Sequence, residues 1–189
     1  MNKISLAVLG LAFMALPAIA ALEAGDTAPK FELRASLDGE EFDYSLSEAL
    51  EAGPVVVYFY PSAYTGGCNI QAHEFAVNME KFKAAGASVI GVSLDSIERL
   101  NDFSADPEYC AGELSVASDA NGDVAASFKL SVREAPVDAK DSRGVEIGHN
   151  MVERTTFIVT SDGEIAVTIG GISPMENVQK SLEAVQSLN

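Results

Sequence analysis

The 189-residue chain is poor in cysteine, in histidine and in basic residues. Its two cysteines, Cys68 and Cys110, form no Cys-x-x-Cys pair, which argues against a thioredoxin-type dithiol oxidoreductase. Together with two isolated histidines, His73 and His149, they make a poor zinc site, so we expect no metal. Only 12 basic residues face 28 acidic ones. This acidic charge argues against nucleic acid or an anionic lipid surface as a partner.

Apolar runs that could cross a bilayer are absent after the first twenty residues. The chain opens with Met1-Asn2-Lys3, an apolar stretch from Ile4 to Leu16, and Pro17-Ala18-Ile19-Ala20. This order predicts a secretory signal peptide over residues 1–20, cleaved after Ala20. An uncleaved anchor is the alternative, but the stretch is shorter than the ~20 residues of a membrane span. We therefore expect an exported protein, periplasmic in a Gram-negative cell or otherwise secreted, that is not membrane-bound after cleavage.

Internal repeats, low-complexity segments and linkers are also missing, so residues 21–189 are expected to form a single domain. Alternating patterns around Asp38-Gly39 predict an N-terminal β-hairpin, and a second hairpin is expected near the C-terminus around Ser161-Asp162-Gly163. Buried strands over 55–60 and 88–94 alternate with helices after Cys68, over 97–105 and over 177–188. This order predicts an α/β fold with a mixed central sheet flanked by helices.

Two segments are less regular. Residues 119–123 look superficially like a calcium loop, but the full twelve-residue ligand pattern is absent, so we predict a turn that precedes a helix over 124–128. Residues 131–149 contain Pro136, Gly144 and many charges. They are interpreted as a surface excursion with one short strand.

The junction at Cys68 is the most informative stretch. The run from Val55 to Tyr60 predicts a buried strand, which Pro61 and two glycines end in a tight loop. Apolar residues then recur at helical spacing, at Cys68, Ala72, Phe75, Met79 and Phe82. Cys68 therefore lies in the first turn of a helix. Unpaired N–H groups and the positive end of the helix dipole favour a nucleophilic thiolate there.

The pattern Pro61-x-x-x-Thr65-x-x-Cys68 resembles the active-site loop of the peroxiredoxins, thiol peroxidases of thioredoxin-like fold. A second similarity is Arg154, which opens the strand Arg154–Val159 where the family has an arginine. The resemblance covers the chain from about Gly25 to the C-terminus and is greatest to the bacterioferritin-comigratory, or Q-type, subclass. One departure is Gly66, where proline is common, and we expect it to leave the loop less rigid.

The resemblance implies a thioredoxin-like fold with an added N-terminal hairpin and a mechanism without metal, flavin or haem. Cys68 would attack hydrogen peroxide or a small organic hydroperoxide and become a sulfenic acid. Peroxide oxygens would be held by the Thr65 hydroxyl, the Arg154 guanidinium and the backbone N–H of Gly67 or Cys68. Pro61 would shield the sulfur from bulk water.

Cys110 leaves three possibilities open. It could resolve the sulfenic acid as a Cys68–Cys110 disulfide, which a thioredoxin-like or other thiol reductant would then reduce; this is the option we favour. Alternatively, an external thiol reduces Cys68 directly. The third possibility is a permanent structural disulfide in a non-catalytic thioredoxin-fold binding module. The protein is expected to be a monomer or a homodimer.

Overall fold

The structure is a computed structural model that describes residues 20–188. The predicted signal peptide lies outside the described residues except for Ala20. Along the chain the elements are β1 (Glu32–Leu37), β2 (Glu40–Ser45), α1 (Leu46–Ala52), β3 (Val55–Phe59), α2 (Gly66–Ala84), β4 (Ser88–Ser93), α3 (Ile97–Ala105), β5 (Ser115–Ser118), α4 (Asp123–Ser127), β6 (Val132–Arg133), β7 (Met151–Val152), β8 (Thr155–Val159), β9 (Ile165–Gly170) and α5 (Pro174–Gln186).

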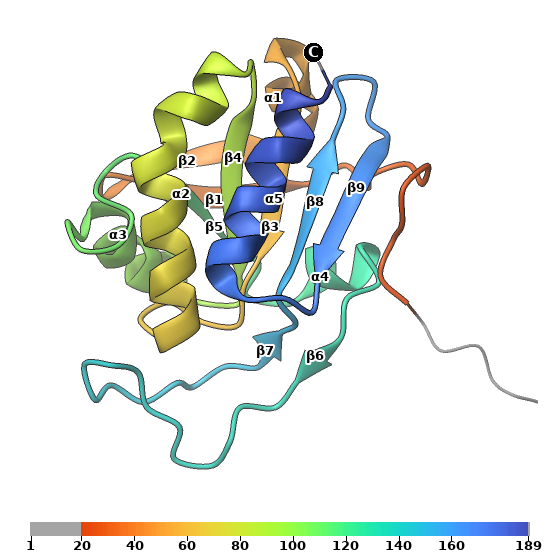
Figure 1. Cartoon of the computed structure of the whole chain (residues 1–189). Helices are drawn as coiled ribbons and strands as arrows, with labels where there is room; N and C mark the ends of the chain where they lie inside the picture. Colours follow the sequence, from red (N-terminus) through yellow and green to blue (C-terminus); the bar gives the residue numbers. More distant parts are fainter. Residues whose placement is uncertain (1–19, 189) are drawn as a thin grey trace, which may run out of the picture.

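A seven-stranded mixed sheet forms the centre of the fold, in the order β2-β1-β5-β4-β3-β8-β9 (Figure 1). Strands β3, β4 and β5 run parallel, and β8 lies antiparallel to β3 on the other side. All five residues of β3 are buried, as expected for a strand covered on both faces. The predicted α/β fold with a mixed sheet and flanking helices is confirmed.

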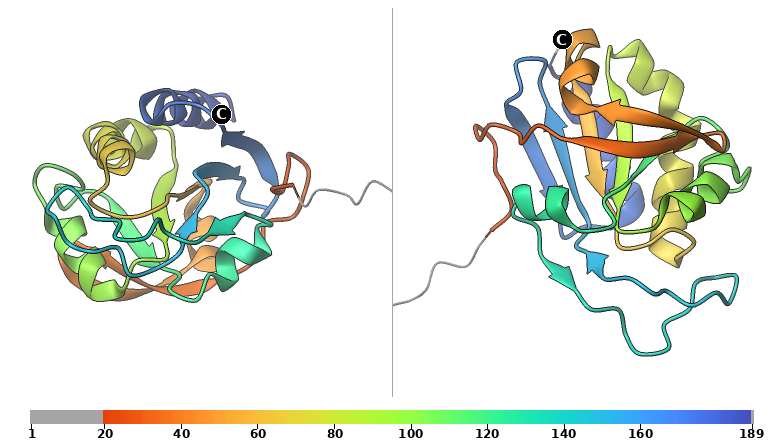
Figure 2. Two further views of the ribbon diagram at one scale, coloured as in Figure 1. Left: turned by 90° about the horizontal axis from the view of Figure 1, so that it is seen from below. Right: turned by 180° about the vertical axis from the view of Figure 1, so that it is seen from behind.

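Two cores lie on opposite faces of the sheet, because side chains alternate along β3. Val56 and Tyr58 face a core formed with α2, α5 and residues of α3. Val55 and Val57 face a second core formed with α1 and α4, which the view from behind shows on that side of the sheet (Figure 2). The junction that leads to Cys68 leaves β3 on the side of the first core.

The N-terminal hairpin is confirmed. Strands β1 and β2 pair antiparallel, and Asp38 and Gly39 between them both have positive φ, 51° and 80°. Two left-handed residues in a two-residue loop match the twist of the adjoining strands, which explains the Asp-Gly sequence. The second predicted hairpin is also present as β8 and β9, joined by a turn through Gly163.

Helix α2 buries all five apolar positions that the helical spacing predicted. It ends at Ala84, followed by Gly86 with φ 75°, in agreement with the predicted helix end. The helix also buries one polar residue among them, Gln71, at 0% exposure. The apolar pattern gave no reason to expect a buried amide at that position.

The excursion over residues 131–149 is more firmly attached than its sequence suggested. Its predicted short strand is β6, which pairs with β7 just beyond the excursion. The segment lies at the same end of the molecule as the N-terminus of α2 (Figure 1). There the N–H of Ser142 donates to the carbonyl of Tyr64 at 2.8 Å. The excursion thus contacts the loop that leads to Cys68.

Residues 119–122 form the predicted turn, and α4 begins at Asp123, one residue earlier than the predicted helix. Both carboxylate oxygens of Asp119 accept backbone N–H groups of that helix, from Val124 at 3.1 Å and from Ala125 at 2.8 Å. In the part of the chain that the structure describes, three or more His, Cys, Asp or Glu side chains do not gather anywhere in a way that could hold a metal ion. Nor does any helix of the described residues have the length and apolar character to cross a membrane.

Candidate active site

The chain leaves β3 at Phe59, passes through Pro61 and enters α2 at Gly66, with Thr65 as the N-cap. Cys68 is the third residue of the helix and is only 2% exposed. The intrahelical hydrogen bonding of this end begins with Asn69, whose N–H donates to the Thr65 carbonyl at 2.8 Å. The N–H groups of Gly67 and Cys68 therefore have no acceptor within the helix, and they are available to a ligand.

Arg154 precedes β8 and reaches this helix end from the neighbouring strand. Its Nη2 donates to Cys68 Sγ at 3.2 Å, and its Nη1 donates to Gln71 Oε1. Gly67 makes room for the guanidinium, because a Cβ at that position would lie 3.2 Å from Arg154 Nη2. The structure thus brings together Cys68, Arg154 and Gly67, although 86 positions separate the arginine from the cysteine.

Thr65 and Pro61 lie on the loop before the helix, and both are half-buried. The Thr65 hydroxyl donates to the Ser62 carbonyl at 2.8 Å and makes no capping hydrogen bond to α2. Its oxygen lone pairs therefore remain free to accept a hydrogen bond.

Tyr64, on the same loop, adopts φ 60° despite its large side chain. A non-glycine residue in this region is strained and needs strong local support.

That support comes from Asp95, a carboxylate with 0% exposure two residues beyond the end of β4. It accepts the backbone N–H of Ala63 at 2.8 Å and the hydroxyl of Ser62 at 3.1 Å. Arg99 Nε and His149 Nε2 each lie 2.8 Å from its Oδ1. Burial opposes ionisation, but the hydrogen bonds from His149 and Ala63 outweigh it, so the pKa of Asp95 is lowered.

This contact favours the charged form of His149. Its Nδ1 lies 2.7 Å from the Asn150 carbonyl and its Nε2 lies 2.8 Å from the Asp95 carboxylate. Since both partners only accept hydrogen bonds, both ring nitrogens carry a proton. Burial lowers the pKa of His149, but the hydrogen bond to Asp95 raises it by more, and the net change is upward.

Asp141 extends this cluster into the excursion. Arg99 Nη2 donates to the Ala63 carbonyl and to Asp141 Oδ2, each at 2.9 Å. Arg143, which also pairs with Asp141, places its guanidinium carbon 3.3 Å from the centroid of the Tyr64 ring. A cation over the ring face stabilises that ring's position. The loop before Cys68 is therefore fixed by β4, by α3 and by the excursion together.

Cys110 follows α3 and is fully buried, with 0% exposure, in the same core as Cys68. Both thiols are free, so the structural disulfide that the sequence allowed is not formed in this structure, and the two cysteines are not near one another. Burial, reinforced by the charge of Asp106, raises the pKa of the Cys110 thiol far above its ordinary value. In this conformation Cys110 is not a nucleophile.

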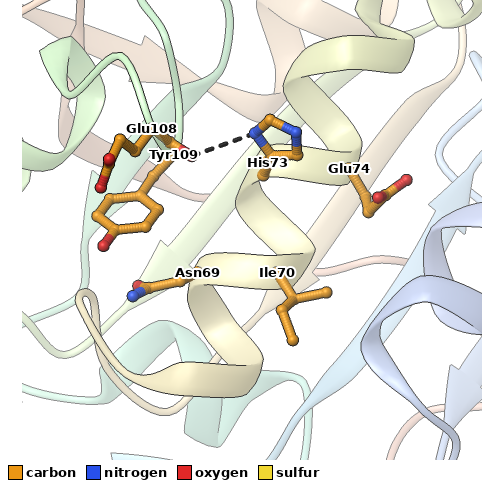
Figure 3. Close-up of a pocket in the computed structure, with 6 residues that line it drawn as sticks. All are labelled: Asn69, Ile70, His73, Glu74, Glu108 and Tyr109. Atoms are coloured by element: carbon orange, nitrogen blue, oxygen red, sulfur yellow. Dashed lines mark hydrogen bonds between the residues drawn. The ribbon is translucent and has the colours of Figure 1, made fainter. Parts of the chain in front are cut away.

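A surface pocket of about 490 Å³ separates the first turns of α2 from the loop that carries Cys110 (Figure 3). It is lined by Asn69, Ile70, His73, Glu74, Glu108 and Tyr109. His73 Nδ1 lies 3.1 Å from the Glu108 carbonyl and so connects the helix to that loop. Cys68 is not among the lining residues, since it points to the opposite, buried side of α2.

Residues 24–168 match the AhpC/TSA family. The chain is a peroxiredoxin. It is 33% identical over 144 residues to "Peroxiredoxin Bcp" of Escherichia coli (strain K12), covering 76% of this chain and 83% of that protein. The structure of "Peroxidoxin BcpB from Mycobacterium tuberculosis" is 30% identical, with a TM-score of 0.72, and covers 89% of this chain and 99% of that one.

A structure of the Xanthomonas campestris bacterioferritin comigratory protein is similar in fold, with a TM-score of 0.64 at 24% identity over 82% of this chain and 91% of that one. The Xanthomonas protein has alkyl peroxide reduction activity. From its family match and its identity to "Peroxiredoxin Bcp", the present peroxiredoxin is a thiol peroxidase of the Bcp and Q type, an antioxidant oxidoreductase. The non-catalytic binding module that the sequence also allowed is thereby set aside.

Several polar residues near this peroxiredoxin site escaped the sequence analysis. The sequence analysis gave Asp95 no role in the site, and the N-cap of α3 is its neighbour Ser96. An acidic residue directly after a strand of buried residues was the signal that could have indicated a buried acceptor. Gln71 and its partner Asn177 gave no such signal, because polar residues on amphipathic helices are usually solvated.

Proposed function

We propose that Cys68 is the peroxidatic cysteine and that the protein reduces hydrogen peroxide and small organic hydroperoxides. The observation that carries this proposal is the 3.2 Å contact of Arg154 Nη2 with Cys68 Sγ at the N-terminus of α2. A guanidinium stays charged at any ordinary pH, and a helix N-terminus favours an anion. Both favour the thiolate, which is the reactive form of cysteine.

In the proposed reaction, the Cys68 thiolate attacks one peroxide oxygen, an S–O bond forms and the O–O bond breaks. Sulfur loses two electrons and the peroxide gains them. The leaving hydroxide or alkoxide takes up a proton and departs as water or an alcohol, which leaves a sulfenic acid on Cys68. Arg154 and the N–H groups of Gly67 and Cys68 would stabilise the negative charge on the leaving oxygen.

Thr65 and Pro61 complete the proposed site. The Thr65 hydroxyl already donates to the Ser62 carbonyl, so it would accept a hydrogen bond from the peroxide proton. Pro61 has no N–H, and its ring would limit access of water to the sulfur. The alkyl peroxide reduction activity of the Xanthomonas campestris relative supports organic hydroperoxides as substrates. The mechanism requires no metal, flavin or haem.

We propose further that Cys110 resolves the sulfenic acid. Its burial and raised pKa mean that the loop after α3 and the first turn of α2 would have to rearrange before its sulfur could reach Cys68. The pocket between these two segments leaves space for such a movement. A thioredoxin-like or other thiol reductant would then reduce the disulfide. If the rearrangement does not occur, an external thiol reduces Cys68 directly.

The cellular setting belongs to the same proposal. Residues 1–20 would direct export, and residues 21–189 would work as a monomer or homodimer in the periplasm or outside the cell. The support is the order of a lysine, an apolar stretch and a small-x-small site at the N-terminus. N-terminal sequencing of protein recovered from the exported fraction tests it. A first residue of Ala21 is expected, and an intact Met1 would overturn this part.

The experiment that tests the chemistry is intact-mass measurement of pre-reduced protein after one equivalent of hydrogen peroxide. Wild type is expected to lose two hydrogens as a disulfide forms. Cys110→Ser should gain oxygen at Cys68, and Cys68→Ser should not change. Oxygen addition at Cys68 in wild type, without a disulfide, would remove Cys110 from the mechanism. No change in any of the three proteins would overturn the proposed role of Cys68.

A further inference from the structure

Arg154 differs from several other arginines of the fold in its partners. Arg34, Arg99 and Arg143 all form ion pairs with carboxylates. Among residues 20–188, no carboxylate lies in ion-pair contact with Arg154. Its partners are Cys68 Sγ and the neutral amide of Gln71. In a chain with 28 acidic residues, the guanidinium beside the proposed thiolate is held by a group that leaves its charge uncompensated.

A chain of hydrogen bonds runs from Arg154 through Gln71 and Asn177 to the Ile169 carbonyl, and the groups at its two ends fix the direction of every bond. A guanidinium only donates, so Gln71 must present its Oε1 to Arg154. Its Nε2 then donates to Asn177 Oδ1 at 3.0 Å. Asn177 Nδ2 in turn donates to the Ile169 carbonyl at 3.2 Å, and a carbonyl only accepts. Each amide therefore has a single orientation that satisfies its neighbours.

This chain of amides is buried and tied to several elements. Gln71, Asn177 and Thr156 all have 0% exposure. The Thr156 hydroxyl adds a second hydrogen bond to Asn177 Oδ1, at 2.7 Å. Gln71 belongs to α2, Asn177 to α5, Thr156 to β8 and Ile169 to β9. Reversing either amide would leave buried donors or acceptors unpaired, which is costly, so the orientation is rigid.

We propose that Gln71 and Asn177 are positioning residues that hold Arg154 against Cys68 Sγ through a neutral hydrogen-bonded relay, so that its full positive charge acts on the sulfur. This inference rests on the proposed role of Cys68. The relay has no place for a carboxylate at position 71. A glutamate there would form an ion pair that compensates the charge of the guanidinium, and its carboxylate could not donate a hydrogen bond to Asn177 Oδ1.

Two further titratable groups, Tyr58 and Glu153, do not supply a counter-charge to the pair. Tyr58 lies close enough to interact electrostatically with Cys68 and Arg154. Burial raises the pKa of Tyr58 well above its ordinary value, so its hydroxyl stays neutral. Glu153, the neighbour of Arg154 in the chain, accepts the Ser131 N–H at 2.8 Å through its carboxylate and is exposed. The charge on Arg154 is thus directed at the sulfur.

The test is made in a Cys110→Ser background, in which Cys68 is the chain's remaining thiol. The rate of alkylation by iodoacetamide is followed from pH 5 to pH 9, and it reports the thiolate whether or not the protein consumes peroxide. For Gln71→Glu, the profile should move upward by about one pH unit, as expected when a charge partner is neutralised. Gln71→Met, which is similar in size and uncharged, loosens Arg154 without compensating its charge, so its profile should move by less than that of Gln71→Glu.

The relay itself is tested by peroxide kinetics in a double-mutant cycle. Gln71→Met should slow the reaction with hydrogen peroxide about tenfold through loss of orientation. In the protein that keeps Gln71, Asn177→Ala should slow the reaction with hydrogen peroxide about threefold. In the Gln71→Met protein it should have no further effect, since the effects of coupled residues are not additive. Folding of each variant is checked by near-ultraviolet circular dichroism and thermal unfolding.

The outcomes that overturn the inference are separate from those that overturn the proposed function. An alkylation profile of Gln71→Glu that coincides with the parent would refute the charge argument, even if peroxide were consumed normally. Equal effects of Asn177→Ala in both backgrounds would refute the relay. If Gln71→Glu does not fold, the double-mutant cycle of Gln71→Met and Asn177→Ala tests the inference on its own. Shifted alkylation without any peroxide consumption would instead support the relay and refute the peroxidase chemistry.

Discussion

Arg154 Nη2 lies 3.2 Å from Cys68 Sγ, across the boundary between β8 and the first turn of α2. The guanidinium adds a full charge to the partial charge of the helix N-terminus, and both act on one sulfur atom. Gly67 allows this approach because a side chain there would crowd Arg154 Nη2. The proposed chemistry of the site depends on this contact.

Arg154→Lys should slow the reaction of the reduced protein with hydrogen peroxide by roughly a hundredfold, the usual cost of losing a donor to a developing negative charge. Lysine keeps the charge but lacks the planar guanidinium, whose two nitrogens donate to Cys68 Sγ and Gln71 at once. The rate is measured by competition with a haem peroxidase for limiting peroxide, since the chain has no tryptophan to report oxidation. Arg133→Lys, an exposed arginine on β6, is the matched control. A rate within threefold of wild type would contradict the role of Arg154.

Gly66→Pro should stabilise the protein by about 0.4–1 kcal/mol. Gly66 is the first residue of α2, where the N–H has no acceptor within the helix and proline is well accommodated. Thr65 before it is extended, with φ −111° and ψ 147°, as a residue before proline should be. A Cβ at position 66 would meet nothing within 4 Å.

Denaturant unfolding measures the effect of Gly66→Pro, and peroxide kinetics should show that activity is kept. Gly66→Ala separates loss of backbone freedom from the specific effect of the ring. A loss of stability in Gly66→Pro would mean that this loop does not begin the helix as the structure shows.

Gly91→Ala should destabilise the fold by about 1–3 kcal/mol. A Cβ at this position on β4 would lie 2.6 Å from the end of the Tyr58 ring, which has no room to move because it stacks on Phe75 with ring centroids 4.5 Å apart. Gly148→Ala is the control, since a Cβ there would meet nothing within 4 Å. Thermal unfolding of both variants checks this, and equal melting temperatures would contradict the packing described for Tyr58.

His149→Gln should weaken the fold in a pH-dependent way. Contact with Asp95 raises the pKa of His149 in the folded state, so its stabilisation is full below the unfolded value of about 6.5 and is lost as the pH rises through the raised value. Gln cannot carry the charge. We expect a loss of roughly 1–2 kcal/mol at pH 6 and a much smaller loss at pH 9, as for a charge-assisted hydrogen bond.

Urea unfolding at the two pH values measures this difference. Asp95, whose pKa is lowered, stays ionised throughout that range, so the change reports His149. His73→Gln is the matched control because His73 contacts a carbonyl instead of a carboxylate. An equal loss at pH 6 and pH 9 for His149→Gln would refute the ion pair.

The sequence predicted much of this architecture because its signals are local. The Asp38-Gly39 turn, the apolar run of β3 and the helical spacing after Cys68 each specify a structure within a few residues. The pairing of Cys68 with Arg154 was expected only through the resemblance to peroxiredoxins. Spacing alone cannot show that β8 lies beside β3 and brings the arginine to the helix.

The polar contacts around the site were beyond prediction for a physical reason. Gln71 and Asn177 are 106 positions apart, and each looks like an ordinary polar residue on its own helix. Only the packing of α2 against α5 makes them partners. Asp95 likewise acquires its function from donors on β4, α3 and the excursion that no short motif places together.

The central claim is tested most directly by the rate at which the pre-reduced protein consumes hydrogen peroxide, compared with Cys68→Ser. We predict that wild type consumes one equivalent per chain in a fast phase and that Cys68→Ser has no fast phase. Cys110→Ser should retain the fast phase, because Cys110 would act only after the sulfenic acid has formed. A fast phase that survives in Cys68→Ser would contradict the claim that Cys68, held beside Arg154, is the residue that reacts with peroxide.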